Sequence, residues 1–349
     1  MLSEASLSSI LERIPRLTLG VVGDLFLDRY LDIDPALTEP SLETGLDAFQ
    51  VVRVRSTPGA AGTVINNLSA LGVKRVVVFS AIGDDGEGYE LGQALDRLGV
   101  VDRTWILRDP GRRTPTYTKP MIHEPGRPPR ELNRLDIKNH APLPGEAEVK
   151  ILAALKKAWP ALDGLLVVDQ VDGREYGVVT ARVLKLLAEL GESDPGKLIL
   201  ADSRERIGEF RAVWLKPNQS ECRGAVEGAS RAIEVCASEL AKRAGRPIFC
   251  TCGERGIFLA DPRPGSASEA WVPAYPVAGP IDIVGAGDST SAAIACAVAG
   301  GAPLADAAAF GNLVASITIQ QIGTTGTAAP EQVRERWQEV AQVHGRVLP

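Results

Sequence analysis

Short apolar runs that end in glycine or aspartate recur along this chain, with helical patterns between them. Residues 17–24 (LTLGVVGD), 76–83 (VVVFSAIG), 164–169 (GLLVVD) and 197–202 (KLILAD) are such runs. Predominantly apolar strands are typical of parallel sheets that are buried on both faces. Strands that alternate with helices imply right-handed crossovers. The pattern therefore predicts an α/β fold with a mostly parallel central sheet between helical layers.

Two segments interrupt this alternation and predict a second, smaller sheet. Residues 31–57 and 112–136 carry prolines, turn residues and alternating β-branched residues without a helical period. Residues 123–126 (HEPG) fit the turn of a hairpin. We expect strands from the two segments to pair into a small β lid over the carboxyl edge of the main sheet. The length of 349 residues suits one large α/β unit, so we expect residues 1–349 to form a single domain with this lid.

The charge and the apolar runs narrow the choice of partners. The formal net charge is −6, which disfavours binding to nucleic-acid phosphates. The longest run of small apolar residues, 292–301, has about half of the ~20 residues that span a bilayer. Residues 1–17 fit an amphipathic helix rather than a signal peptide. We expect neither a nucleic-acid nor a membrane partner.

The cysteines indicate the compartment. There are five, unevenly spaced, which does not suit a disulfide framework. Cys250 and Cys252 form a C-x-C pair, but the three histidines are scattered and a second pair of metal ligands is not evident. We interpret the cysteines as core residues of a cytoplasmic protein.

Residues 280–301 (PIDIVGAGDSTSAAIACAVAGG) contain the turn that bears most directly on chemistry. Gly285, Ala286 and Gly287 let backbone N–H groups converge at the start of a helix, where the helix dipole favours an anion such as a phosphate. Asp288 beside them fits a general base that accepts a proton from an attacking hydroxyl group. A plain helix N-cap remains the alternative. A dinucleotide fingerprint would need glycine where Thr290 stands, and a Walker Gly-Lys-Ser/Thr sequence is absent.

The ordered motifs of the chain resemble those of the ribokinase-like (PfkB) carbohydrate kinase family. They are residues 21–30 (VVGDLFLDRY), 58–72 (PGAAGTVINNLSALG), 81–88 (AIGDDGEG), 216–221 (KPNQSE), 251–256 (TCGERG) and 282–289 (DIVGAGDS). The resemblance implies a three-layer α/β/α fold with a β lid that often forms a homodimer surface. It also implies transfer of phosphate from ATP, with Mg²⁺, to a sugar or sugar phosphate, and leaves open a monovalent cation.

The resemblance also assigns residues. It makes Asp288 the catalytic base and Gly285, Ala286 and Gly287 the anion hole. The residues that it implies for substrate are Asp28, Gly59, Thr63, Asn67, Lys119, Arg134 and Asp282. Those that it implies for the nucleotide are Asn218, Glu221, Thr251, Gly253 and Asn312, with Glu221 holding Mg²⁺ through water.

Within the family the chain looks most like heptose-phosphate kinases, yet its recognition residues depart from their pattern. Ala60 replaces a glycine, Thr63 replaces an asparagine that contacts sugar hydroxyls, and residues 169–173 (DQVDG) lack a tyrosine and a lysine. Because buried hydroxyl groups need partners, these changes predict a different substrate. Two other functions remain open: a noncatalytic ligand sensor, and a nucleoside or vitamin kinase on the same fold.

Overall fold

A nine-stranded sheet forms the centre of the computed structural model, which describes residues 2–227, 230–265 and 269–345. The strands lie in the order β16 (Glu269–Val272), β15 (Ile257–Ala260), β14 (Ile248–Thr251), β13 (Trp214–Leu215), β12 (Leu198–Ser203), β11 (Gly164–Asp169), β1 (Thr18–Gly23), β6 (Arg75–Gly83) and β7 (Val101–Asp109). Neighbours from β7 to β14 run parallel, and β15 and β16 are antiparallel. The predicted α/β fold with a mostly parallel sheet is confirmed.

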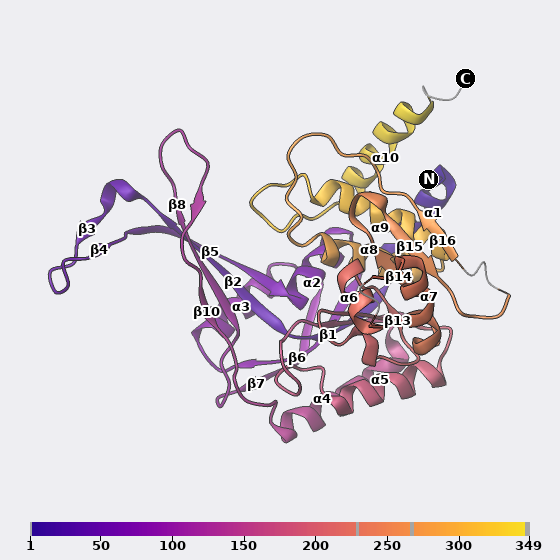
Figure 1. Cartoon of the computed structure of the whole chain (residues 1–349). Helices are drawn as coiled ribbons and strands as arrows, with labels where there is room; N and C mark the ends of the chain where they lie inside the picture. Colours follow the sequence, from indigo (N-terminus) through magenta and orange to yellow (C-terminus); the bar gives the residue numbers. More distant parts are fainter. Residues whose placement is uncertain (1, 228–229, 266–268, 346–349) are drawn as a thin grey trace.

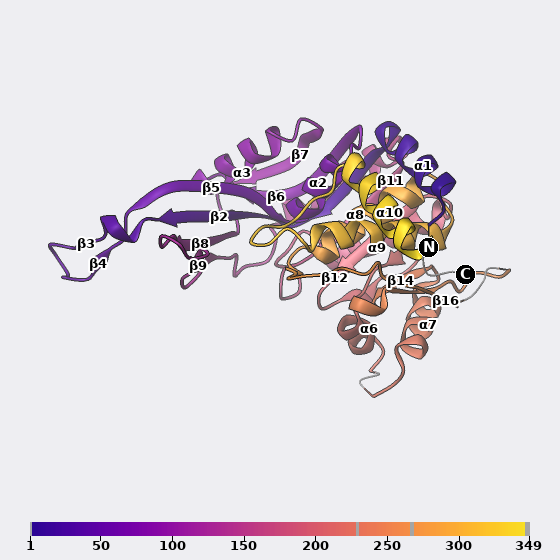
Figure 2. The same ribbon diagram turned by 90° about the horizontal axis from the view of Figure 1, so that it is seen from above.

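Helices cover both faces of this sheet because its strands are apolar on both sides. Along β1, Val21 packs into one core and Val22 into the other. The first layer contains α1 (Glu4–Arg13), α2 (Ala61–Ala70), α3 (Gly86–Asp96), α8 (Ala286–Ala299), α9 (Leu304–Thr318) and α10 (Pro330–Gly345). The second contains α4 (Gly145–Ala158), α5 (Ala181–Ser193), α6 (Gln219–Ala225) and α7 (Ile233–Ala244). Figure 2 shows α8 and α6 on opposite sides of the sheet. No helix in the described ranges could cross a membrane.

A five-stranded lid extends away from the sheet (Figure 1). Its strands are β2 (Leu25–Ile33), β5 (Val51–Ala60), β8 (Thr116–Ile122), β9 (Arg130–Glu131) and β10 (Leu135–Ile137). β2 pairs antiparallel with β5 and parallel with β8, so the two distant segments do pair as expected. β3 (Glu39–Pro40) and β4 (Asp47–Ala48) form a small hairpin at the tip. The lid begins at Leu25, earlier than predicted, and the division into domains stays a prediction.

One residue, Asp24, separates β1 of the main sheet from β2 of the lid. β1 ends at Gly23, where a Cβ atom would stand 2.2 Å from the carbonyl oxygen of Val168, so only glycine fits there. Asp24 donates its N–H to that same oxygen, and β2 begins at the next residue. At the same end of the lid, where β5 leads into α2, Ala60 pairs with Leu25 and has φ +52° and ψ −117°, a conformation that favours glycine. Both connections lie at the carboxyl edge of the sheet.

Candidate active site

The turn at residues 285–288 begins α8 at the carboxyl edge. Gly285 lies in the left-handed region, with φ +79°, and Asp288 stands in the first turn of the helix. The following side chains, from Ser289 to Ala297, are small and buried, so α8 packs closely against α2 and α9. The N-terminus of α8 therefore presents its positive dipole and backbone N–H groups at this edge, although the N–H of Ala286 donates to the carbonyl oxygen of Ile283 at 3.1 Å.

Asp288 is partly buried, and its surroundings favour the protonated form. Burial and the nearby Asp202 raise the pKa of Asp288 to about 7, although Lys216 and Arg204 oppose the shift. A carboxyl group with a pKa near neutrality can accept a proton from a hydroxyl group and release it afterwards. This suits the role of general base, which stays a prediction.

Lys216 lies beneath the turn as a buried cation. Its Nζ is 3.0 Å from Oδ2 of Asp202, and Ser291 of α8 donates a 2.9 Å hydrogen bond to that oxygen. The same Nζ stands 3.6 Å from where a Cβ atom on Gly287 would lie. Burial opposes the charge, but Asp202 raises the pKa of Lys216 above its ordinary value. A fixed positive charge thus stands next to the predicted anion hole.

The residues predicted for the nucleotide lie around the start of α6. Asn218 caps this helix: its Oδ1 accepts from the Glu221 N–H at 2.9 Å, and Glu221 Oε2 accepts from the Asn218 N–H at 2.7 Å. Thr251, at the end of β14, pairs with Asn218 in an isolated bridge, and Gly253 follows with φ +57°. Asn312 lies elsewhere, on α9, where its amide donates to the carbonyl groups of Val272 and Pro273.

The site offers few protein ligands for a metal ion. Among the described residues, no group of three or more His, Cys, Asp or Glu side chains could hold one. Burial raises the pKa of Glu221, whereas the Asn218 N–H and Lys216 lower it. Mg²⁺ commonly binds through one or two carboxylates, water and substrate phosphates. One carboxylate at Glu221 fits that mode of binding.

Several residues predicted for substrate gather on the lid side of Asp288. Asp28 is buried, and its Oδ1 lies 3.4 Å from Nζ of Lys119. Gly59 lets Asp28 approach, because a Cβ atom there would stand 2.9 Å from Oδ2 of that carboxylate. Burial raises the pKa of Asp28, and Lys119 and Arg134 oppose the shift. Thr63, in the first turn of α2, approaches Gly285.

Three predicted substrate residues have other partners. Arg134 forms a bidentate pair with Asp136 and stacks over the ring of Tyr117. Asn67 is fully buried in α2 and donates to the carbonyl of Thr63. Asp282 accepts from the N–H groups of Val284 and Gly323, and so ties the loop before α8 to the loop after α9.

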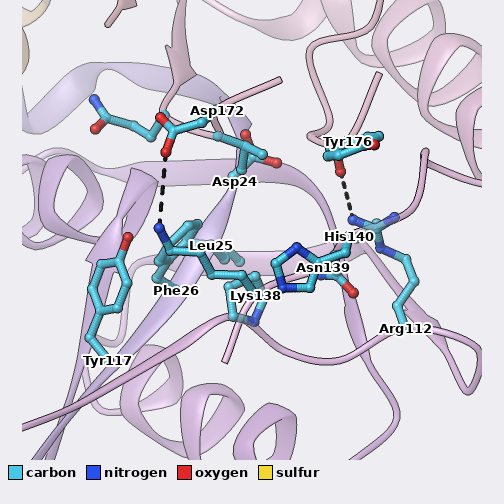
Figure 3. Close-up of a pocket in the computed structure, with 14 residues that line it drawn as sticks. Asp24, Leu25, Phe26, Arg112, Tyr117, Lys138, Asn139, His140, Asp172 and Tyr176 are labelled. Carbon is cyan, nitrogen blue, oxygen red and sulfur yellow. Dashed lines mark hydrogen bonds and ion pairs between the residues drawn. The ribbon is translucent and has the colours of Figure 1, made fainter. Parts of the chain in front are cut away.

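Three features of the site were missed by sequence reasoning. Lys216 stands in the quoted motif KPNQSE without an assigned role, and Asp202 fitted an ordinary strand end. The third feature is a cavity between the lid and the sheet, lined in part by Asp24 (Figure 3). The sequence feature that could have indicated these residues is the polar residue at the end of each strand, because the carboxyl ends of neighbouring parallel strands meet at one edge of the sheet.

The chain is similar in sequence to known proteins. Residues 182–332 match the sequence profile of the pfkB family carbohydrate kinases. The bifunctional protein HldE of Trichlorobacter lovleyi is 31% identical over 333 residues, which are 93% of this chain and 64% of that protein. HldE of Pelobacter propionicus is 31% identical over 336 residues, 94% of this chain and 64% of that protein. The chain therefore spans less than two thirds of the length of these relatives.

Solved structures share the fold. A ribokinase from Arabidopsis thaliana complexed with ribose and ATP has a TM-score of 0.65 and 17% identity, over 92% of this chain and 98% of that one. Phosphofructokinase-2 from Escherichia coli in complex with potassium has a TM-score of 0.66 and 15% identity, over 93% and 99%. At this level of identity the likeness establishes the fold, which is ribokinase-like as predicted.

Proposed function

We propose that this chain, which carries a pfkB-family carbohydrate kinase domain at residues 182–332, transfers the γ-phosphate of ATP to a hydroxyl group of a sugar or sugar phosphate. The position of Asp288 carries the proposal. Asp288 lies at the N-terminus of α8, and it is close enough to both Lys216 and Asp28 for their charges to act on its carboxyl group. A base, an anion site and an acceptor-binding carboxylate thus lie together, as phosphoryl transfer requires.

The reaction that we propose forms one bond and breaks another. Asp28 orients the acceptor. The hydroxyl oxygen of the acceptor attacks the γ-phosphorus of ATP while Asp288 takes the proton of that hydroxyl group. The bond from the γ-phosphorus to the bridging oxygen breaks, and ADP leaves with the electron pair. The N–H groups at residues 285–287 and the charge of Lys216 stabilise the transferred group. Mg²⁺, held through Glu221 and water, would supply further positive charge to the phosphates.

Release of ADP across a panel of acceptors tests this function. The panel contains hexoses, pentoses, heptose phosphates and nucleosides, each with ATP and Mg²⁺. We expect ADP with at least one sugar or sugar phosphate, and none when Asp288→Asn replaces the wild type. Turnover with nucleosides alone would instead identify a nucleoside kinase. Thermal shifts with sugars but no ADP would identify a ligand sensor.

We also propose that the lid joins two copies of the chain. β5 is an edge strand of the lid sheet, and Val51, Val52 and Val54 on it are exposed. An edge strand that exposes apolar side chains favours pairing with another strand, and a second copy would present the same edge in a symmetric contact. A cytoplasmic location fits the five cysteines, which are buried and form no disulfide bond within the described part of the chain.

Light scattering coupled to size-exclusion chromatography measures this association. We expect the wild type to elute as a dimer and Val52→Lys as a monomer, because a charge on the edge strand disfavours pairing. Val235→Lys is the matched control: it changes an exposed valine on α7, outside the lid, and should leave the dimer intact. A monomeric wild type would contradict the proposal.

A further inference from the structure

A cavity of about 230 Å³ lies between the lid and the carboxyl edge of the sheet (Figure 3). The cavity adjoins Asp28. Phe26, which lines the cavity, stands two residues before Asp28 on β2, so the two side chains lie on the same face of that strand. Tyr117, which pairs with Asp28 across β2 and β8, also lines the cavity. Small-molecule sites usually measure about 300–1,000 Å³. The cavity is therefore suited to one end of an acceptor whose other end lies near Asp28.

One wall of the cavity is aromatic. The rings of Phe26 and Tyr117 lie 5.1 Å apart at an interplanar angle of 60°. Arg134 covers the ring of Tyr117 at 4.1 Å, and its bidentate pair with Asp136 holds it in place. This wall offers a fixed apolar surface to the carbon skeleton of a small ligand.

The floor contains buried polar groups whose hydrogen-bonding capacity is not used. Asp24 Oδ1 accepts from the Val178 N–H at 2.7 Å, but Oδ2 has no partner within the described part of the chain. Arg112 donates to the carbonyl groups of Tyr176 and Pro142, and its Nε is also unpartnered among those residues. Buried polar groups normally have partners. A ligand with hydroxyl groups would provide them.

The ionisation of Asp24 fits hydroxyl recognition. Burial raises the pKa of Asp24 to about 7, and Asp169 adds to this, whereas the Val178 N–H and Arg112 oppose it. A carboxyl group that is partly protonated near neutral pH can donate a hydrogen bond as well as accept one. A sugar hydroxyl group has the same two capacities, so the two are complementary.

The charges that line the cavity do not favour a phosphate. The Lys138 Nζ lies 3.9 Å from Oδ2 of Asp172, on the opposite wall (Figure 3). The terminal nitrogens of Arg112 donate to backbone carbonyl groups, and Asp24 lies close enough to influence its charge. Lys138 and Arg112 thus each have a carboxyl group near them, and a phosphate would meet two carboxyl groups. Cations bind phosphate through charge-assisted hydrogen bonds, and the donors of these two side chains already face protein oxygen atoms.

We propose that this cavity binds the uncharged, hydroxylated end of the acceptor sugar, and that Asp24 and Asp172 make the chain prefer free sugars over the same sugars with a terminal phosphate. The inference rests on the proposed kinase function and specifies its substrate class. Asp172 excludes the anion by charge, and Asp24 binds a hydroxyl group.

The test compares kcat/KM for matched pairs, each a sugar and its terminal phosphate ester. We expect the wild type to prefer the free sugar by at least tenfold. Asp172→Lys should shift that ratio at least tenfold toward the phosphate ester, mainly through KM for the ester. The Asp172 side chain is 67% exposed, so this variant should fold. Asp84→Lys is the matched control, because Asp84 is an exposed carboxylate paired with Arg108 outside the cavity.

Two results would overturn the inference: a wild type that prefers the phosphate ester, or a ratio that Asp172→Lys does not move. Calorimetric titration of the same pairs separates it from the proposed function. Preferential binding of the free sugar that is lost in Asp24→Leu, with no ADP from any pair, would support the cavity and refute the kinase. The absence of binding and turnover with every pair would refute both.

Discussion

Asp288→Asn should lower kcat about 10²- to 10⁴-fold, the range for loss of a general base, and leave the Kd for ATP within about twofold. The substitution keeps the size of the side chain but removes the group that accepts the hydroxyl proton. The pH profile provides a second readout. Because the pKa of Asp288 is raised to about 7 and the base is the deprotonated form, kcat of the wild type should rise as pH increases through about 7. The variant should lack that rise.

Asp306→Asn is the matched control for this experiment. Asp306 also stands in the first turn of a helix, but this helix is α9, and the predicted anion hole belongs to α8. We expect its kcat to match the wild type. Full activity in Asp288→Asn would show that this residue is not the base. Its remaining role would be the favourable charge of a carboxylate in the first turn of α8, because the N-cap position itself belongs to Gly285.

Lys216→Met should destabilise the fold by about 3–5 kcal/mol, because it leaves the carboxylate of Asp202 buried without its cation. Lys216 is 3% exposed and Asp202 7%, so water cannot replace the lost charge. Urea denaturation measures the change. Because the pKa of Lys216 is raised in the folded protein, the pair stabilises the fold fully at pH values below the ordinary pKa of lysine. This stabilisation is lost as the pH rises through the pKa of Lys216 in the folded state. The difference in unfolding free energy between the wild type and Lys216→Met should therefore be complete at pH 7.

The same variant has a catalytic signature that a purely structural lysine would not give. Lys216 lowers the pKa of Asp288, so its removal should move the rise in kcat to higher pH. Because Asp202 raises the pKa of Asp288, adding Asp202→Asn to Lys216→Met should move the rise in kcat back to lower pH. The double variant should also recover part of the lost stability, because the buried carboxylate is removed. Arg103→Met breaks an exposed pair with Asp96 and should leave the unfolding midpoint nearly unchanged. An unaltered pH profile in Lys216→Met would contradict the role of this charge.

The sequence could predict the parts of the site that are local in the chain. The turn at 285–288 and the capping box at Asn218 and Glu221 each lie within four consecutive residues, so backbone preferences alone indicate them. The pair of Lys216 with Asp202 is different, because it joins the ends of β12 and β13, and only the order of strands in the sheet makes these neighbours. Sequence patterns carry little information about such contacts.

The lid shows a second limit of prediction. The lid was predicted to begin at residue 31, but strand β2 already begins at Leu25, and its first four residues are all buried. Lys119 and Arg134 were predicted to bind substrate. The pairing of β2 with β8 places Lys119 beside Asp28, whereas Arg134 pairs with Asp136 two residues further along its own segment. The availability of a cation depends on its carboxylate partner, and the partner of Lys119 lies on another strand.

Asp28 lies close to the main sheet although it belongs to the lid. β2 begins one residue after β1 ends, has nine residues, and so extends about 30 Å from the sheet, at ~3.3 Å per residue. Asp28 is near its start, and the next residue, Arg29, pairs with Glu87 and Glu90 of α3, whereas the β3–β4 hairpin lies beyond its far end. A displacement of the tip would therefore move Asp28 much less than it moves the hairpin.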